Sequence, residues 1–190
     1  GVERADKAQR DAGGRRRCHC WRRGYWIAMS YVGTCCRGRG LITVDPSRYA
    51  LISAQKLGAT HVIDPQEEDA RKQVYDIIPD GPDLVVEAAG PIAAVELMAQ
   101  LRRRGTRWNV FGITTHETFE LDGGLTHFLE GRMDASFGTK PAAMQRAVRL
   151  MESGLVNTED INSQRFKLSE IHRAIEVMGQ PERNKVMIQI

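Results

Sequence analysis

The sequence lacks several features that would each indicate a particular class of protein. Its 190 residues contain no apolar run near the roughly 20 residues that a membrane-spanning helix needs, which argues against a helical membrane protein. The N-terminus is polar and basic, unlike a secretory signal, so we expect a cytoplasmic protein. The C-x-x-C spacing of common zinc knuckles is also absent. The 42% apolar and 27% charged residues are ordinary for a globular protein with a real core.

Charge is distributed unevenly along the chain. The net charge of +3 combines +7 in residues 1–40 with −4 in residues 41–190. All four cysteines and two of the three tryptophans also lie in the first 40 residues. The chain therefore has two compositions that meet near Gly40, and we expect residues 1–40 to be an aberrant basic segment unlike the rest.

The most informative stretch begins directly after Gly40. A short β-branched apolar run, Leu41–Val44, is followed by Asp45, then by a helical pattern over Ser47–Leu57 and a second strand at His61–Ile63. A carboxylate at the C-terminal end of a buried strand is how a dinucleotide-binding sheet holds the adenosine ribose, because it accepts hydrogen bonds from both ribose hydroxyls. A 2′-phosphate there would meet a negative charge, so Asp45 favours NAD over NADP.

Strands and helices continue to alternate through the rest of the chain. This alternation, with helices of about ten residues, predicts a doubly wound parallel α/β sheet. Further strands are expected at residues 83–87, 107–113 and 185–190, and further helices at residues 66–75, 92–101, 126–130, 141–153 and 169–178, the last with Ser169 as its N-cap.

Five pieces of the sequence occur in an order and spacing shared with a known family. They are ITVDPSRYALISAQKLGATHVIDP, PDLVVEAAG, the turn and strand from Arg103 to Ile113, ASFGTKPAAMQRAVRLMESG and FKLSEIHRAIEVMGQPERNKVMIQI. Together they resemble the C-terminal half of a zinc-type medium-chain alcohol or polyol dehydrogenase. The resemblance implies a Rossmann-like fold and a parent reaction that transfers hydride between a secondary alcohol or polyol and NAD.

The resemblance also implies which residues contact the cofactor. Asp45 would bind the adenosine ribose, with Arg48 nearby in place of a basic residue that many members carry where this chain has Ala50. Lys185 falls where the family often places a cation near the pyrophosphate. The groove-lining positions would be Ala89 and Gly90 after one strand, Gly112 and Ile113 near the nicotinamide, and Ala135 and Phe137 as main-chain partners of the carboxamide.

Two departures from the family pattern set the expected limits of function. The ligands of the family's catalytic and structural zinc ions have no counterpart in these residues, and without that Lewis acid an alcohol hydroxyl is not acidified. The glycine-rich turn that holds the pyrophosphate is missing before Leu41, so the sheet is expected to be incomplete at its first strand. We therefore expect residues 41–135 to form a dinucleotide-binding domain, residues 136–190 to form a tail that in the family completes the catalytic domain, and the whole to be a cofactor-binding fragment that is inactive alone.

A shifted reading frame over about residues 6–38 would explain the aberrant segment. Read one base later, the codon of Trp21 becomes a glycine codon whichever arginine codon follows it, and the codon of His19 becomes isoleucine or threonine. The codon of Cys18 becomes valine or alanine. With a free choice of third bases, residues 15–24 can then read as an apolar strand followed by glycines, so the sequence is compatible with this hypothesis. Genomic sequencing tests this hypothesis.

Other interpretations of the same residues stay open. Asp45 could be an ordinary strand-end acid or helix cap, and Glu87 is expected to be a groove-side acid with satisfied hydrogen bonds rather than a catalytic base. The basic residues 15–23 could form a nucleic-acid-binding arm. The chain could also be a non-catalytic nucleotide-binding protein, a homo-oligomer, or a protein that pairs with an intact subunit. A zinc site is not expected from the spacing of Cys18, Cys20, Cys35 and Cys36.

The tail carries one further expectation. Without a catalytic domain to complete, it should expose an apolar docking surface around Phe166, Ile171, Ile175 and Met187.

Overall fold

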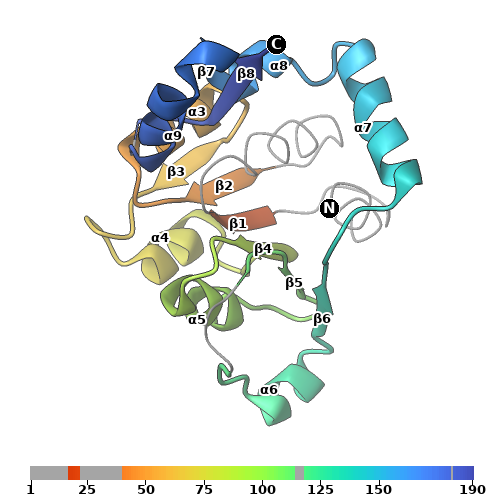
Figure 1. Cartoon of the computed structure of the whole chain (residues 1–190). Coiled ribbons are helices and arrows are strands. Elements are labelled where there is room, and N and C mark those ends of the chain that lie inside the picture. The colour runs from red at the N-terminus through yellow and green to blue at the C-terminus, as the bar shows by residue number, and fades with distance from the viewer. Residues whose placement is uncertain (1–16, 22–39, 114–117, 181) are drawn as a thin grey trace.

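The structure is a computed structural model of the chain, and it describes residues 17–21, 40–113, 118–180 and 182–190 (Figure 1). For residues 17–21 the description is limited to the backbone. Within this part of the chain six strands form one parallel sheet and two more form a second sheet. The strands are β1 (Arg17–Trp21), β2 (Leu41–Val44), β3 (His61–Ile63), β4 (Leu84–Ala88), β5 (Arg107–Val110), β6 (Arg132–Ala135), β7 (Asn162–Lys167) and β8 (Lys185–Gln189).

The large sheet has the strand order β3-β2-β1-β4-β5-β6, and every neighbouring pair is parallel. The chain winds outward from β1 through β2 to β3, and then from β4 through β5 to β6 in the other direction. The direction of winding therefore reverses between β1 and β4. In open parallel sheets, ligands bind in the crevice outside the carboxyl ends of the strands at this reversal.

Helices cover both faces of the large sheet, which confirms the predicted doubly wound α/β architecture (Figure 1). No helix among the described residues combines the length and apolar character needed to cross a bilayer. The helices are α3 (Arg48–Lys56), α4 (Ala70–Ile77), α5 (Ile92–Gln100), α6 (Gly123–Phe128), α7 (Pro141–Glu152), α8 (Thr158–Ile161), the 3-10 turn η1 (Leu168–Glu170) and α9 (Ile171–Gly179).

Two apolar clusters hold these helices on the sheet. On one face, residues of β2, β3, β4 and β5 pack against α4 and α5, with Val85 and Trp108 almost completely buried between them. The indole Nε1 of Trp108 donates a hydrogen bond of 2.9 Å to the Leu101 carbonyl, so its polar atom is satisfied inside the core. On the other face, Ala54 and other small residues of α3 pack against β4. Strand β4 is buried along its whole length, as a central parallel strand should be.

The structure corrects one part of the expected fold. The sheet was expected to be incomplete at its first strand, yet the backbone of residues 17–21 fills that position as β1. It pairs with β2 on one side and β4 on the other, with Cys18 in register with Ile42 and Val85. The strand is present because parallel pairing uses backbone groups, which any sequence supplies. The turn that follows β1 lies outside the described residues, and the hypothesis of a shifted reading frame stays untested.

Several element boundaries also differ from the prediction. Helix α4 begins at Ala70 rather than Gln66, because the Asp69 side chain accepts a hydrogen bond from the Lys72 N–H and caps the helix there. The predicted N-cap Ser169 is wrong, since it lies within the 3-10 turn η1 that precedes α9. Strands β6 and β7 and the short helix α8 were not predicted.

The C-terminal tail forms a small unit of its own. Strands β7 and β8 pair in parallel, and α9 packs on them through a cluster centred on Phe166, Ala174 and Val177. The expected exposed surface is therefore only partly present: Phe166 is buried, whereas Ile175 is 59% exposed and Met187 is 37% exposed. Phe166 is covered because α9 folds back over its own sheet.

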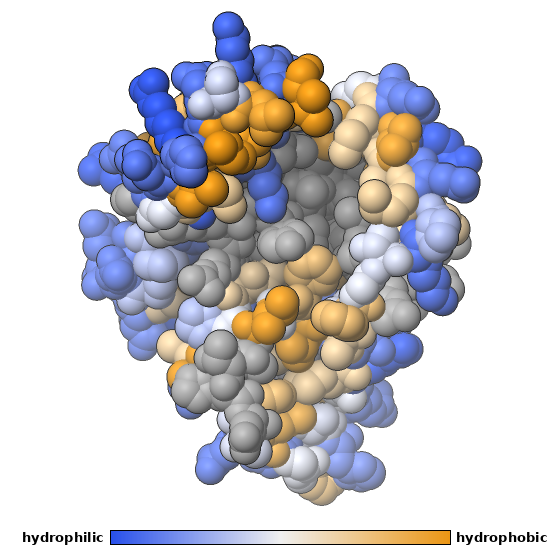
Figure 2. Space-filling model, viewed as in Figure 1, coloured by the Kyte–Doolittle hydropathy of each residue, from blue (hydrophilic) through white to orange (hydrophobic). Residues whose placement is uncertain are grey.

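A second exposed apolar stripe runs along α7 and just beyond it. Met144, Val148, Met151 and Leu155 are all between 43% and 60% exposed. Their spacing of four, three and four residues places them on one side of a helix. Figure 2 shows hydrophobic residues over α7 and over the α9–β8 part of the molecule. The C-terminal residues thus expose large apolar side chains on α7, α9 and β8.

Candidate cofactor-binding site

The predicted cofactor-binding residues gather at one edge of the large sheet. Asp45 follows β2, Gly90 follows β4, Gly112 follows β5, and Ala135 ends β6. Because these strands are parallel, their carboxyl ends meet at the same edge. The structure therefore brings together residues that lie up to 90 positions apart in the sequence. Lys185 is the exception, because it begins β8 in the separate two-stranded sheet.

Asp45 is a buried acid, only 3% exposed, at the end of a fully buried strand. Its backbone N–H donates to the Ile63 carbonyl at 3.2 Å, which ties it to β3. Its side-chain Oδ1 accepts a hydrogen bond of 2.7 Å from the Ser47 N–H. Ser47 in turn caps α3, since its Oγ accepts from the Ala50 N–H at 3.3 Å. Asp45 is therefore not itself the helix cap, and its carboxyl group is fixed in place by the turn before α3.

Ala50 and Arg48, the two positions considered for a contact near the adenosine, have different surroundings. Ala50 is 4% exposed and packs in the cluster between α3 and β4, so a long charged side chain would not fit there without rearrangement. Arg48, the first residue of α3, is exposed two positions earlier. It is a cation in the first turn of α3, three residues after Asp45 in the sequence.

The loops after β4 and β5 touch each other through glycines. Gly90 adopts a positive φ of 94°, a conformation that favours glycine, and a Cβ at this position would collide with the Ile113 carbonyl. A Cβ at Gly112 would lie 2.7 Å from the Gly90 nitrogen and 2.9 Å from the Ala88 carbonyl carbon. The two loops are thus packed backbone against backbone, which neither could do with a side chain at these positions.

The side chain of Glu87 contacts both of these loops, and its hydrogen bonding differs from the prediction. It is completely buried, and its Oε1 accepts hydrogen bonds of 2.6 Å from both the Ala89 and the Gly90 N–H groups. The prediction of satisfied hydrogen bonds is wrong for one oxygen, because the buried Oε2 has no hydrogen-bond partner among the described residues. The sequence contained one signal for this role, an acid directly before the A-A-G turn.

The remaining predicted residues are open to solvent. Ile113 is 80% exposed and Phe137 is 89% exposed, while Ala135 is exposed at the end of β6. The Ser136 N–H donates to the Val110 carbonyl at 3.0 Å, which extends the pairing of β5 and β6 up to this edge.

Metal ligands are not brought together in the part of the chain that the structure describes. Within those residues, no group of three or more histidine, cysteine, aspartate or glutamate side chains is placed to hold a metal ion. The side chains of all four cysteines lie outside the described residues.

Charge pairs on the surface lie away from this edge. The Asp76 carboxylate, 2.7 Å from the Lys72 amine, raises the pKa of that amine. The Arg104 guanidinium, hydrogen bonded to Glu130 at 2.9 Å, lowers the pKa of the Glu130 carboxyl, and Glu130 raises the pKa of Arg104. Both pairs are exposed, so they contribute little to stability.

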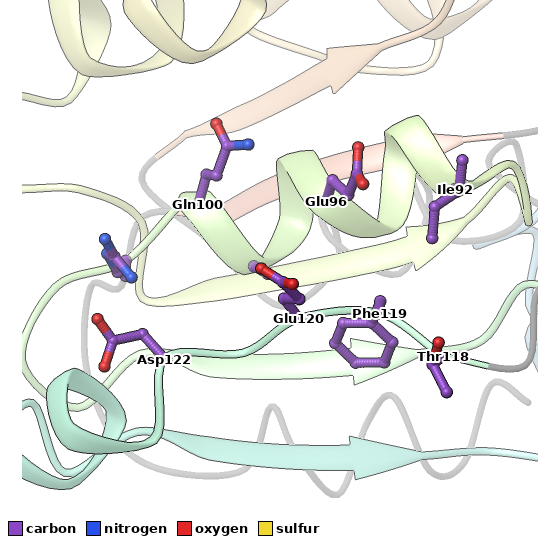
Figure 3. A pocket seen from close by; sticks show the side chains of 9 residues that line it. Ile92, Glu96, Gln100, Thr118, Phe119, Glu120 and Asp122 are labelled. Carbon is purple, nitrogen blue, oxygen red and sulfur yellow. The ribbon is translucent and has the colours of Figure 1, made fainter.

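A hollow of about 500 Å³ lies on the other side of α5, between that helix and residues 118–122 (Figure 3). Glu96 and Gln100 line it from the helix, and Phe119 and Glu120 line it from the facing segment. The carboxyl of Asp122, which also lines it, accepts from the Leu125 N–H and caps α6. These acids are exposed, and the hollow extends along α5 from Ile92, two residues after Gly90, to Arg102.

Comparison with known proteins identifies the family. The family model described as zinc-binding dehydrogenase matches residues 34–153, which is well over half of the chain. The chain belongs to the zinc-binding dehydrogenase family. This confirms the resemblance that the five sequence pieces indicated.

Curated members of the zinc-binding dehydrogenase family show how much of a whole protein the chain represents. The chain is 29% identical over 149 residues to the D-arabitol-phosphate dehydrogenase of Enterococcus avium, a match that covers 78% of this chain and 42% of that protein. It is 27% identical over 139 residues to the sorbitol dehydrogenase of Bacillus subtilis, with 72% and 38% covered. The chain thus spans less than half the length of these relatives, and it is homologous to their cofactor-binding portion.

Solved structures share the fold. A protein of Sinorhizobium meliloti, described as a zinc-binding dehydrogenase and solved with NADP bound, matches with a TM-score of 0.88 at 21% identity, covering 99% of this chain and 56% of that one. The benzyl alcohol dehydrogenase of Acinetobacter calcoaceticus matches with the same TM-score at 19% identity, covering 100% and 53%. At these identities the likeness establishes the fold alone. The Sinorhizobium meliloti protein, which has this fold, binds the nucleotide cofactor NADP.

Proposed function

We propose that this chain is the NAD(H)-binding part of a zinc-type alcohol or polyol dehydrogenase. The observation that carries the proposal is the buried Asp45 carboxyl at the end of β2, fixed by the Ser47 N–H at the carboxyl edge of a doubly wound sheet. An acid in this position accepts hydrogen bonds from the 2′- and 3′-hydroxyls of an adenosine ribose. The same acid disfavours a 2′-phosphate, so the preferred cofactor is NAD(H) rather than NADP(H).

The residues at the edge of the sheet fit a dinucleotide. Asp45 and the exposed Arg48 follow β2, on one side of the point where the winding of the sheet reverses, and they bind the adenosine half of the cofactor. The loops that contain Gly90 and Gly112 follow β4 and β5, on the other side of the reversal. There the backbone of these loops contacts the nicotinamide half of the cofactor. Bound NAD supplies the hydride acceptor at its nicotinamide ring. The role of this chain's residues is to bind and orient the cofactor, with Ala135 and Phe137 beside the carboxamide.

Zinc chemistry is not assigned to the residues that the structure describes. Within those ranges, no group of three or more histidine, cysteine, aspartate or glutamate side chains is placed to hold the ion. We propose that the chain by itself binds cofactor without oxidising a secondary alcohol, and that the zinc ligands and most of the substrate pocket belong to a separate part of the dehydrogenase. Lys185, on the second sheet, is proposed as a contact only when that part is in place.

Calorimetric titration with NADH and with NADPH tests the binding proposal. We expect NADH to bind at least about tenfold more tightly than NADPH, because each 1.4 kcal/mol of lost pairing or added repulsion is a factor of ten. Equal affinity for the two, or no binding of either, contradicts the proposal. Incubation of the same protein with NAD, zinc and a panel of secondary alcohols should give no NADH absorbance above a protein-free control.

A second candidate function is pairing with another dehydrogenase subunit. Among the described strands, β6 lies at the edge of the large sheet and pairs only with β5. Such an edge presents backbone groups that can extend the sheet into a second chain. Size-exclusion chromatography with light scattering tests this, since pairing predicts a dimer whose mass falls to that of a monomer when proline replaces Met133 in β6.

A further inference from the structure

Glu87 is a buried acid whose surroundings the proposed cofactor contacts do not explain. It is completely buried on β4, the strand that borders the reversal of the sheet. Its Oε1 accepts two short hydrogen bonds from the Ala89 and Gly90 N–H groups, and its Oε2 is buried with no hydrogen-bond partner in the part of the chain that the structure describes. Burying a polar atom without a partner is costly, so the position is one where a role other than stability is expected.

The free oxygen of Glu87 is aimed at the second loop. A Cβ built on Gly112 would lie 2.7 Å from Oε2, so the loop after β5 passes directly over this oxygen. The backbone of that loop is also anchored to Glu87, because its carbonyl accepts from the Phe111 N–H at 2.7 Å and from the Gly112 N–H at 2.9 Å. One residue thus holds the loop after β4 with its side chain and the loop after β5 with its main chain.

We propose that Glu87 is a positioning residue that sets the separation of the β4 and β5 loops and so shapes the nicotinamide half of the groove. This inference rests on the proposed function of NAD(H) binding. Glu87 acts through Gly90 and Gly112 rather than by touching the cofactor. The adenosine half, held on the far side of the reversal by Asp45, shares none of these contacts.

The geometry predicts a selective effect on binding. When Glu87 is replaced by alanine, the Ala89 and Gly90 N–H groups lose a buried acceptor and the turn is free to open. NADH, which needs both halves of the groove, should then bind at least about tenfold more weakly. AMP, which occupies only the adenosine half, should bind within about twofold of wild type. Glu87→Gln should restore NADH binding, because the amide oxygen of glutamine accepts the same two hydrogen bonds.

The experiment measures the affinities of NADH and AMP for wild type, Glu87→Ala and Glu87→Gln by NMR titration, with thermal unfolding recorded for each variant. Loss of NADH affinity with retained AMP affinity, rescued by glutamine, supports the inference. Equal weakening of both ligands, or no weakening of NADH, overturns it. If wild type binds neither AMP nor NADH, the proposed function itself has failed, which is a different result.

A second variant covers the case in which Glu87→Ala does not fold. Gly112→Ala leaves Glu87 in place but adds a methyl group 2.7 Å from its Oε2, which forces the two loops apart. The same selective loss of NADH affinity is expected. Gly123→Ala is the matched control, because a Cβ there meets nothing within 4 Å and the residue lies in α6. NADH binding by Gly112→Ala at the wild-type level would rule out control of the groove by this contact.

Discussion

At the scale of single residues, the turn after β2 combines a structural role with the proposed binding role. Asp45, Pro46 and Ser47 form a short link in which one oxygen of Asp45 orders the backbone at Ser47, and Ser47 then caps α3. The sequence was sufficient to single out Asp45, because an acid directly after a β-branched run is conspicuous. It did not show that the carboxyl would be buried, since burial depends on β3 and α3 packing around it.

Arg48 provides a prediction at this scale. It is exposed at the first turn of α3, so its contribution to cofactor binding should be mainly electrostatic. We expect Arg48→Ala to weaken NADH binding about threefold in dilute buffer and to have little effect in 0.5 M salt, because salt screens exposed charges. Affinity titrations at the two salt concentrations measure this. A loss that is independent of salt would mean that Arg48 acts through packing instead.

Glu87 shows where residue patterns stop being informative. Its neighbours Ala88, Ala89 and Gly90 predicted a turn at the end of a buried strand, which the structure confirms. Nothing in that pattern distinguishes an acid with two satisfied oxygens from one with a free oxygen. The difference arises from Gly112, 25 residues later, which leaves room above one oxygen but supplies no donor to it.

At the scale of elements, strands with a clear apolar signal were the most predictable part of the fold. β2 and β3 begin and end where the sequence predicted. β2 is a short apolar, β-branched run that is buried along its whole length, whereas β3, at the sheet edge, buries only Ile63. β6 and β7 were missed for the opposite reason. β6 reads RMDA at the sheet edge, and β7 reads NSQRFK with only Phe166 buried, so neither carries an apolar signal.

Glycines at turns provide a prediction for the elements. Gly81 and Gly105 both have positive φ, of 87° and 75°, but a Cβ at Gly81 would lie 2.6 Å from the Arg102 carbonyl oxygen, whereas one at Gly105 would meet nothing. We expect Gly105→Ala to lower the free energy of unfolding by about 1 kcal/mol through backbone strain alone. Gly81→Ala should lower it by about 2 to 4 kcal/mol, because the clash is with backbone that must move.

Urea denaturation of the two glycine variants measures this difference directly. Each variant serves as the control for the other, since both replace a turn glycine by alanine. Equal destabilisation would show that the turn before β4 is looser than the structure describes.

At the scale of the whole molecule, the tail distinguishes this chain from a self-contained cofactor-binding domain. Two apolar clusters pack the helices against the large sheet. The tail has one small cluster and two exposed apolar areas, one on α7 and one on α9 and β8. The sequence predicted an exposed surface around residues of β7, α9 and β8, which is present only in part, but not the stripe on α7. The stripe could not be located from sequence, because the same spacing is also typical of a helix whose apolar face is covered.

The α7 stripe leads to a prediction for the purified protein. We expect it to bind a hydrophobic dye such as ANS, because exposed apolar stripes do so. Replacing Met144, Val148 and Met151 together by glutamine should lower dye fluorescence at least about twofold and reduce self-association. Replacing Gln145 and Glu152 by alanine, on exposed polar positions of the same helix, should leave both unchanged. Unaltered fluorescence in the triple variant would place the dye-binding surface elsewhere.

The central claim, that the carboxyl edge of the large sheet holds NAD(H) through Asp45, has a closely matched control within the chain. Asp64 follows β3 as Asp45 follows β2, each stands before a proline, and the Asp64 Oδ1 accepts from the Gln66 N–H at 2.9 Å as the Asp45 Oδ1 accepts from the Ser47 N–H. Both turns should lose the same local hydrogen bond when alanine replaces the acid. The two acids differ in their position in the sheet. Asp45 follows β2, which is next to β1, whereas Asp64 follows β3 at the outer edge.

Calorimetric titration of NADH into wild type, Asp45→Ala and Asp64→Ala is the most direct test. We predict that Asp45→Ala weakens NADH binding at least about tenfold, because the ribose hydroxyls lose a shared acceptor. Asp64→Ala should bind within about twofold of wild type. If both variants bind NADH as wild type does, or if both lose affinity alike, Asp45 does not hold the ribose and the account is contradicted.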